Sequence, residues 1–289
     1  MKIQWRSTHY TTTTITIDKY LLPAFGEKEI SLISKSDILQ FRSGLSDIKG
    51  RKGASLSPSR VNHIMNPLRM ILNEAASRYN FTSPYHGIKS LKVPRTDVEP
   101  FSMDEVRTII DTVRPDFRNY FILRFFTGMR TSEIDGLLWE HIDFASRKIN
   151  IRQALVAGEV VYTKNDGSFR EIDMSTPVYE ALLDQKKATG EFKFVFCSRN
   201  GTPLNHNNVT NRVWFPLLRH LELRKRRPYQ TRHTAATLWL AAGENPEWIA
   251  RQMGHTTTEM LFRVYSRYVP NLTRKDGSAF ERLLGWFQK

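Results

Sequence analysis

The sequence predicts a mainly α-helical protein with a small antiparallel β-sheet, an α+β fold divided into two domains. Apolar residues recur at helical spacing through most of the 289 residues, and they alternate with polar residues only within 149–174. A stretch with two prolines and little periodicity separates the two helical parts. We therefore expect a helical domain over 1–90, a linker over 91–100, and a second domain over 101–289 that includes a C-terminal tail, 269–289.

The composition is that of an ordinary globular chain. Hydrophobic residues make up 40% and charged residues 25%, which excludes a disordered or collagen-like protein. The single cysteine, Cys197, excludes an internal disulfide and a cysteine-based zinc site. No apolar stretch has the form of a signal peptide or a membrane span, so we expect a cytoplasmic protein without a membrane partner.

The net charge is the first informative departure from the average. The chain has 43 Lys and Arg against 29 Asp and Glu, a formal charge of +14. A polyanion is the expected partner, because neutralised phosphates release counterions and so drive binding. No basic amphipathic helix with an aromatic face is evident, so nucleic acid is favoured over a membrane surface.

The first domain is predicted to contain three helices. A Thr-rich segment over 8–22 forms the first, and Ser36 is expected to cap the second. Ser57 and Pro58 have the residue types preferred at the N-cap and first position of a third, longer helix. Pro67 inside that helix should kink it, because an interior proline removes a hydrogen bond.

The second domain opens with a strong helix signal. Ser102 and Glu105 have the spacing of a capping box. The following segment, FRNYFILRFFTG, is apolar nearly all round, which predicts a buried helix that Gly128 ends. Further helices are expected over 177–187 and 206–221.

The middle of the second domain is predicted to be the antiparallel sheet. Residues 149–151 and 172–174 alternate between apolar and polar, and 160–162 continue as a strand. The sequence NDGS at 165–168 is of hairpin-turn type and lies between the last two strands.

Several common catalytic motifs are absent from the sequence. It has no phosphate-binding P-loop, no dinucleotide-binding glycine pattern and no H-E-x-x-H, and its eight histidines lack metal-ligand spacing. Acidic residues are scattered instead of gathered as a two-metal nuclease requires. We therefore expect neither a metal nor another cofactor.

Arg130 is the first candidate for binding a phosphate. It lies in TGMRTSEIDGLLW, in a short break between two helices, and Thr131 or Ser132 can cap the second of them. Exposed backbone N–H groups at such a place favour an anion, and arginine recognises phosphate well. A local pair with Glu133 or Asp135 is the alternative.

Two further segments carry candidate residues at helix ends. Arg232 lies at the start of a helix in PYQTRHTAATLWLAAG. A short helix in NPEWIARQMGH should end at Gly254, which leaves His255 just beyond it. Thr256 and Glu259 have capping-box spacing for a final helix.

Taken together, these segments resemble the tyrosine recombinase family, and the phage integrases in particular, over nearly the whole chain. TGMRTSEIDGLLW is similar to the family's first arginine box, YQTRHT to its H-x-x-R box, and MGHTTTEMLFRVYSRY to its last histidine and nucleophilic tyrosine. The first domain is similar to the family's core-binding domain and the second to its catalytic domain. The resemblance implies site-specific cutting and rejoining of DNA, in phage or mobile-element integration and excision. We expect the arm-binding module of many integrases to be absent, because it would have no room before Thr8.

The resemblance also implies a role for each candidate. Tyr265 would attack the scissile phosphate and form a 3′-phosphotyrosyl bond, which preserves the phosphodiester energy for religation. Arg130 and Arg232 would bind the phosphate oxygens, and His255 would add a donor. Lys164 would protonate the leaving 5′-oxygen.

Some of these roles have rivals. Tyr229 stands where the family pattern has histidine. A tyrosine can donate a hydrogen bond to a phosphate but accepts protons poorly. General-base catalysis is therefore expected to be weak or to fall on another group. Tyr268 is the rival nucleophile, since Tyr265 could be a core aromatic. Lys164 could be an ordinary exposed lysine, and His233 is expected to support the helix start.

Basic residues in both domains are expected to contact the DNA backbone, with a solvated basic loop as the alternative. The resemblance implies attachment sites in double-stranded DNA as the partner, a homotetramer on DNA, possible accessory DNA-bending or excision factors, and a location at the bacterial nucleoid. The candidate DNA-binding residues are Lys52, Arg60, His63, Arg224, Arg226 and Arg227.

Two other classes of function stay open. A relative of the type IB topoisomerases would share the chemistry, but the MGH segment and the first domain argue against it. A non-catalytic DNA-binding repressor would need only the charge. The tail ends in FERLLGWFQK, where Phe280, Leu283 and Phe287 have the spacing of a short amphipathic helix. Such a helix could fold back on its own domain, but the resemblance implies that these residues dock on an adjacent subunit.

Overall fold

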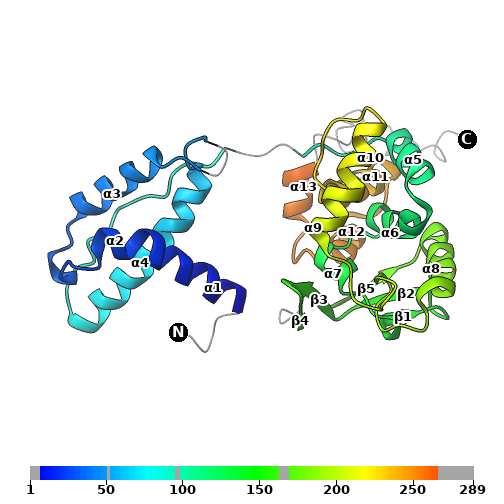
Figure 1. The fold of residues 1–289 in the computed structure, drawn as a ribbon, viewed down its shortest axis with the longest axis horizontal. Coiled ribbons are helices and arrows are strands. Elements are labelled where there is room, and N and C mark those ends of the chain that lie inside the picture. Colours follow the sequence, from blue (N-terminus) through cyan, green and yellow to red (C-terminus); the bar gives the residue numbers. More distant parts are fainter. Residues whose placement is uncertain (1–6, 51–52, 95–97, 163–168, 266–289) are drawn as a thin grey trace, which may run out of the picture. The chain divides into compact units, whose positions relative to one another are not determined.

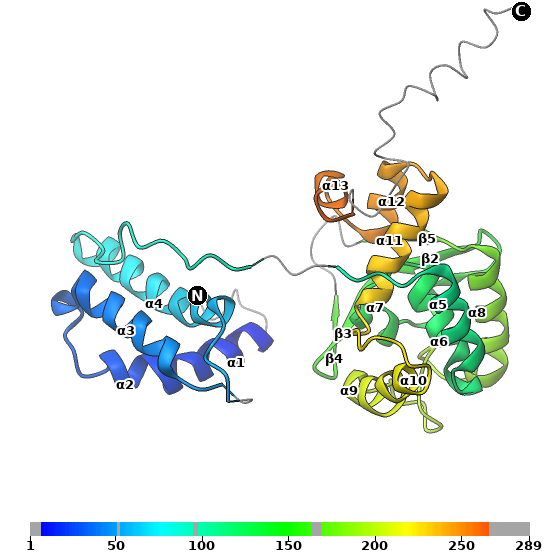
Figure 2. The ribbon, with the colours of Figure 1, turned by 90° about the horizontal axis from the view of Figure 1, so that it is seen from above.

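The computed structural model describes residues 7–50, 53–94, 98–162 and 169–265. The chain divides into two compact units, Met1–Thr96 and Asp97–Lys289, each with its own hydrophobic core. Figures 1 and 2 show helices throughout both units, with the strands confined to the second. The predicted α+β class is confirmed.

The regular elements in the described part of the first unit are helices, and one isolated β-bridge joins Lys49 to Ser55. Ser57 caps its longest helix and Pro58 opens it, as predicted. This helix runs on through Pro67, whose ring is buried. The helices of this unit are α1 (Ser7–Thr16), which continues through a π-helical turn (Ile17–Leu21) into α2 (Leu22–Phe25), a 3-10 turn (Ile30–Leu32), α3 (Lys35–Asp47) and α4 (Pro58–Tyr79).

The predicted cap of α3 is wrong by two residues. Ser34, not Ser36, is the N-cap: its hydroxyl accepts from the Asp37 backbone N–H, and the Asp37 carboxylate accepts from the Ser34 N–H at 2.9 Å. Asp37, three residues after Ser34, completes the capping box as a glutamate would. Its position explains why Ser34 and not Ser36 is the N-cap.

The second unit begins as predicted. The Ser102–Glu105 capping box is formed, and Val106 behind it is fully buried. Gly128 follows the end of the second helix with φ +61°, the left-handed conformation that glycine favours there. The helices are α5 (Met103–Thr112), α6 (Pro115–Phe126), α7 (Thr131–Asp135), a 3-10 turn (Trp139–His141), α8 (Thr176–Thr189), α9 (His206–Val209), a π-helical turn (Thr210–Trp214), α10 (Phe215–His220), α11 (Gln230–Ala242), α12 (Pro246–Met253) and α13 (Glu259–Tyr265).

In the described part of the second unit, five short strands form two antiparallel sheets, and their pairing corrects the predicted hairpin. Within the described residues the strands are β1 (Ile142–Asp143), β2 (Lys148–Ile151), β3 (Gln153–Val156), β4 (Glu159–Tyr162) and β5 (Arg170–Asp173), in the orders β1-β2-β5 and β3-β4. β4 therefore pairs with β3 and not with β5. Ala157 and Gly158 both have positive φ, which makes a tight two-residue turn between β3 and β4. Residues 165–168 lie outside the described part.

Among the described residues of the second unit, two apolar clusters pack the helices and strands together. The larger is built around the fully buried Trp214, which stacks on Phe121 with ring centroids 5.2 Å apart. The smaller packs α11, α12 and α13 together through Leu240, Met253 and Leu261, among others. No helix in the described part of the chain is long and apolar enough to cross a membrane.

Candidate active site

Arg130 lies at the N-terminus of α7 and is bound locally by Glu133. The Glu133 carboxylate accepts from the Arg130 backbone N–H and from its guanidinium, each at 2.8 Å. The helix begins at Thr131 with Arg130 as the preceding residue, so the expectation that Thr131 or Ser132 caps it is wrong. The Arg130 side chain is 35% exposed, which leaves part of its guanidinium open to solvent.

Arg170 on β5 is a second, buried partner of the same carboxylate. Its two terminal nitrogens donate to Glu133 at 3.0 and 2.7 Å, and its Nε donates to the Gln252 carbonyl at 2.7 Å. Burial alone would raise the pKa of Glu133, but hydrogen bonds and charge from Arg170 and Arg130 lower it to about 2. Glu133 is therefore a fixed negative charge between two guanidinium groups.

Arg232, in the first turn of α11, is only 2% exposed. Its guanidinium donates to the carbonyls of Gly128 and Met253, the latter at 2.6 Å, and its Nη2 lies 3.1 Å from Nε2 of His255. Burial lowers the pKa of Arg232 to about 10, so the group stays charged at neutral pH.

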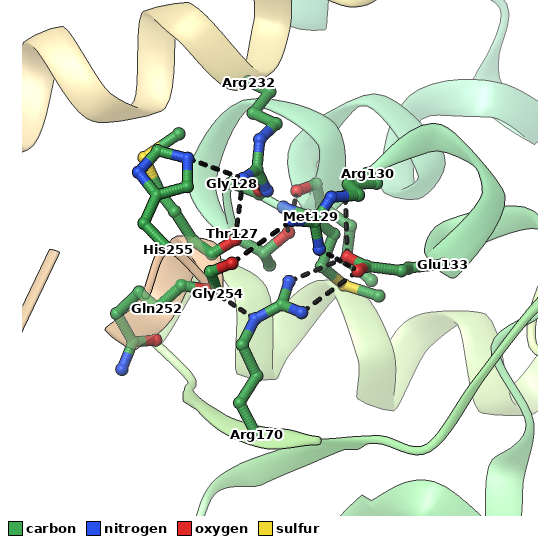
Figure 3. A network of polar contacts seen from close by, with 12 residues as sticks. Thr127, Gly128, Met129, Arg130, Glu133, Arg170, Arg232, Gln252, Gly254 and His255 are labelled. Atoms are coloured by element: carbon green, nitrogen blue, oxygen red, sulfur yellow. Dashed lines mark hydrogen bonds and ion pairs between the residues drawn. The ribbon is translucent and has the colours of Figure 1, made fainter. Parts of the chain in front are cut away.

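The three arginines meet at the C-terminal end of α12 (Figure 3). Arg170, Arg232 and Arg130 donate to three consecutive carbonyls, those of residues 252, 253 and 254, at 2.7, 2.6 and 3.2 Å. Helix ends leave such carbonyls without backbone partners, and the helix dipole makes them a negative pole that attracts cations. Segments far apart in the sequence are thus fixed around one helix end.

His255 comes directly after this helix end. A guanidinium only donates hydrogen bonds, so Nε2 of His255 accepts from Arg232 and the ring proton is on Nδ1. Among the described residues nothing accepts from this buried Nδ1. Burial, and then the charges of the three arginines, lower the pKa of His255 to about 4, so the ring is neutral at pH 7.

Tyr265, at the end of α13, is 2% exposed and packs in the apolar cluster beside Leu261. Its hydroxyl lies 2.6 Å from Nδ1 of His233, and burial raises its pKa. Tyr229 is 45% exposed, and its ring lies edge-on to His233 with centroids 5.1 Å apart. The predicted capping box for α13 is wrong, because the helix begins at Glu259 itself.

A buried network joins the loop of Arg130 to the loop of Tyr229. Arg124 donates to the Thr131 hydroxyl at 2.9 Å and to the Pro228 carbonyl at 3.1 Å. It also donates to the Tyr120 hydroxyl, which donates to Asp135 at 2.7 Å. Asp135 is therefore not a partner of Arg130, and burial raises its pKa to about 6.

A groove of about 790 Å³ opens beside Arg130 and Tyr229. The β3–β4 turn and Asn205–Asn207 form its walls, and Asp135 is its only acidic lining residue among those described. The two most exposed catalytic candidates thus line a groove with little negative charge, whereas Arg232 and Tyr265 are buried and do not line it.

The candidate DNA-binding residues differ in their surroundings. Arg60 and His63 line a groove of about 530 Å³ in the first unit. Arg224 is exposed but paired with Glu99 at 2.9 Å, and Arg227 is exposed. Arg226 is turned inward: it pairs with Glu105 at 2.8 Å and lies over the Phe101 ring. Lys52, Lys164, Tyr268 and the tail 269–289 lie outside the described residues.

Sequence reasoning missed two residues of this site, Arg170 and Gln252, and it named a third, His233, only as a support for the helix start. The two missed residues gave no signal, because a single charged or polar residue in a short element is common on protein surfaces. His233 follows Tyr229 by one helical turn, so it lies near the position where the resemblance places a histidine.

Comparison with known proteins decides the family. The phage integrase family model matches residues 100–271, more than half of the chain, and the model of the N-terminal SAM-like domain of phage integrases matches residues 1–46. The chain belongs to the phage integrase family. The predicted family is confirmed, and with it the class of enzyme, a tyrosine-type site-specific recombinase. The topoisomerase and repressor alternatives are not favoured.

Individual relatives agree with this assignment. This integrase-family chain is 28% identical to the prophage integrase IntR of Escherichia coli K12 over 84% of its length and 67% of that protein. It is 22% identical to the ICEBs1 integrase of Bacillus subtilis, over 98% of this chain and 80% of that protein. Its fold is similar to that of the Tn1549 transposon integrase in complex with a circular intermediate DNA, with TM-score 0.79, 19% identity, and 97% and 95% of the two chains covered.

The buried ion pair of this family member gives a testable stability effect. Arg170→Met leaves Glu133 buried with Arg130 as its remaining charged partner, so we expect the free energy of unfolding to fall by about 3 kcal/mol. Arg114→Met, which breaks an exposed pair with Asp116, is the matched control and should change it by less than about 0.5 kcal/mol. Urea unfolding measures both; equal shifts would contradict a structural role for Arg170.

Proposed function

We propose that this protein cuts and rejoins double-stranded DNA at specific attachment sites through a 3′-phosphotyrosyl intermediate, in the integration or excision of a phage or mobile element. The observation that carries the proposal is the convergence at the end of α12. Arg130 and Arg232 donate to adjacent carbonyls there, His255 contacts Arg232, and the residue after Arg232 holds the Tyr265 hydroxyl.

In the proposed reaction the Tyr265 oxygen attacks the phosphorus, and the bond from phosphorus to the 5′-oxygen breaks. The released 5′-hydroxyl takes its proton from Lys164, a role that is proposed from the family resemblance alone. A 5′-hydroxyl from the partner strand then attacks the phosphotyrosine and restores a phosphodiester. Covalent capture divides one transesterification into two and conserves the bond energy.

The positive groups are proposed to stabilise the phosphorane-like transition state. Arg130 and Arg232 would bind the non-bridging oxygens, whose charge grows as the phosphorus becomes pentacoordinate. The neutral ring of His255 would donate a further hydrogen bond, and the exposed Tyr229 hydroxyl would donate another from the groove. Side chains supply every charge in this scheme, so we propose that it needs neither a metal ion nor a nucleotide.

Covalent capture on a pool of DNA duplexes tests this function. The target sequence need not be known in advance, because the captured duplexes reveal it. A library of nicked duplexes with a randomised centre is incubated with the protein in EDTA, and adducts that resist SDS are isolated and sequenced. A recombinase yields adducts at a recurring sequence that also exchanges strands with a second duplex. Relaxation of supercoiled DNA without sequence preference would favour a topoisomerase, and binding without an adduct would favour a repressor.

We also propose that the protein acts as a homotetramer on DNA at the nucleoid, with its C-terminal tail docked on a neighbouring subunit and accessory factors involved. The fold is similar to that of lambda integrase, which is described as a tetramer bound to a Holliday junction (TM-score 0.67, 15% identity, 94% and 74% of the two chains covered). Sedimentation of the protein on a Holliday junction made from the captured site measures the subunit number; a monomer or dimer would contradict the proposal.

The proposed backbone contacts predict a graded salt dependence. Binding should weaken with salt, log K falling by roughly 0.9 per neutralised phosphate for each unit of log salt concentration. Arg227→Ala and Arg60→Ala should each reduce this slope by about 1, because each removes a phosphate contact. Arg226→Gln should leave the slope unchanged, since that guanidinium is held by Glu105. Fluorescence anisotropy across a salt series measures the slopes, and a flat response in the parent protein would contradict backbone binding.

A further inference from the structure

The Tyr265 hydroxyl contacts a histidine, His233, on the neighbouring helix α11. The distance from Nδ1 of His233 to the Tyr265 oxygen is 2.6 Å. His233 lies in the first turn of α11, next to Arg232, and the Tyr265 ring is buried in the cluster that packs α11 against α13. The residue that contacts the proposed nucleophile, His233, therefore follows directly in sequence the arginine that is proposed to bind the phosphate, Arg232.

The His233 ring is unprotonated at neutral pH, so a ring nitrogen is free to accept a hydrogen bond from the Tyr265 hydroxyl. Burial, followed by the charge of Arg232, lowers the pKa of His233 to about 4, so the ring is uncharged. A phenol is a better hydrogen-bond donor than a neutral imidazole, so Nδ1 accepts from the hydroxyl and the ring proton is on Nε2. Among the described residues, the titratable or charged groups that face His233 are Tyr265, Tyr229, Arg232 and His255, and none of them is a carboxylate.

The attacking oxygen needs such an acceptor. Burial raises the pKa of Tyr265, so its phenolate is rare at neutral pH, and a neutral phenol attacks phosphorus poorly. Tyr229 occupies the position of the histidine in the H-x-x-R pattern, and another phenol cannot take this proton. The imidazole absent at 229 is present one helical turn later, in contact with the hydroxyl.

We propose that His233 is the general base of the cleavage step, a role that rests on the proposed function of Tyr265 as the nucleophile. The Tyr265 proton passes to Nδ1 of His233 as the oxygen–phosphorus bond forms, and the electron pair of the breaking bond goes to the 5′-oxygen, which is protonated by a separate donor. In the rejoining step His233 returns its proton to the departing Tyr265 oxygen.

Two substitutions separate proton transfer from mere positioning of the ring. His233→Gln keeps an amide oxygen that can accept the Tyr265 hydrogen bond but cannot take the proton. His233→Ala removes both abilities and leaves space for a small molecule. His220→Gln is the matched control, because His220 is exposed at the end of α10, a helix that supplies none of the site residues named above.

The test measures the single-turnover rate of adduct formation on the nicked duplex recovered by covalent capture. We expect His233→Gln to be slower by about 100-fold or more, while its DNA affinity and urea midpoint stay near those of the parent. Between about pH 6 and pH 8 the parent rate should be nearly flat, whereas the Gln variant should gain roughly tenfold per pH unit as solvent hydroxide replaces the ring. Added imidazole should partly restore His233→Ala.

A modified substrate distinguishes proton removal from Tyr265 from proton donation to the leaving 5′-oxygen. A 5′-bridging phosphorothiolate gives a leaving group that needs no proton, so it should not restore His233→Gln if the ring acts on Tyr265. Restoration by this substrate, a parent-like rate for the Gln variant, or a pH profile parallel to the parent's would each overturn the role of His233. If the parent forms no adduct at all, the proposed function fails; if parent and His220→Gln form it and His233→Gln forms it equally fast, only this inference fails.

Discussion

Tyr265→Phe is expected to abolish covalent attachment to DNA and leave DNA affinity nearly unchanged. The substitution removes one oxygen, the proposed nucleophile, and keeps the ring that packs beside Leu261. The lost hydrogen bond to His233 should lower the free energy of unfolding by only about 1 kcal/mol, so the variant stays folded. SDS-resistant adducts on the captured duplex measure attachment, and anisotropy measures affinity.

Tyr268→Phe is the matched control for this experiment. It alters the same residue type three positions later and should form the adduct at the parent rate. If Tyr265→Phe still forms the adduct and Tyr268→Phe does not, the nucleophile has been misassigned.

Arg232→Lys is expected to lower the cleavage rate by about 100- to 1,000-fold, the effect of losing a preorganised oxyanion donor. The Arg232 guanidinium contacts Gly128, Met253 and His255 at once, and an ammonium cannot reproduce this planar geometry and also bind a phosphate. Burial also disfavours the charged form of a lysine there.

The rate of adduct formation under single-turnover conditions measures this effect. Arg107→Lys, on the exposed face of α5 beside Asp104, is the control and should cleave at the parent rate. Cleavage by Arg232→Lys within about threefold of the parent would contradict direct stabilisation of the transition state, since a lost charge-assisted hydrogen bond costs more than that.

The sequence predicted the helical framework well because its signals are local. Ser57 with Pro58, Ser102 with Glu105, and Gly254 each act within one helical turn, and each is found at its predicted helix end. The β3–β4 hairpin was missed because its turn, Ala157–Gly158, lacks the Asn or Asp that usually marks positive φ.

The candidate site was predictable only where a contiguous motif exists. Arg130, Arg232 and His255 stand in short segments with a recognisable order, so their convergence could be expected. The partnership of Arg170 with Glu133, and that of His233 with Tyr265, join residues that are 37 and 32 positions apart. Such pairings depend on how the sheet and α13 pack on α11 and α12, which no local pattern encodes.

The arginine contacts at the end of α12 also determine how many donors remain for a ligand. A guanidinium has five N–H groups. The contacts of Arg232 with Gly128, Met253 and His255 use three of them, and those of Arg130 with Glu133 and Gly254 use two. Counting only contacts among the described residues, five hydrogens are left between the two side chains, as many as both non-bridging oxygens of a phosphodiester could accept. If the two arginines bind the scissile phosphate as proposed, they need not give up the contacts that orient them. Their arrangement is then established when the protein folds and not when it binds DNA.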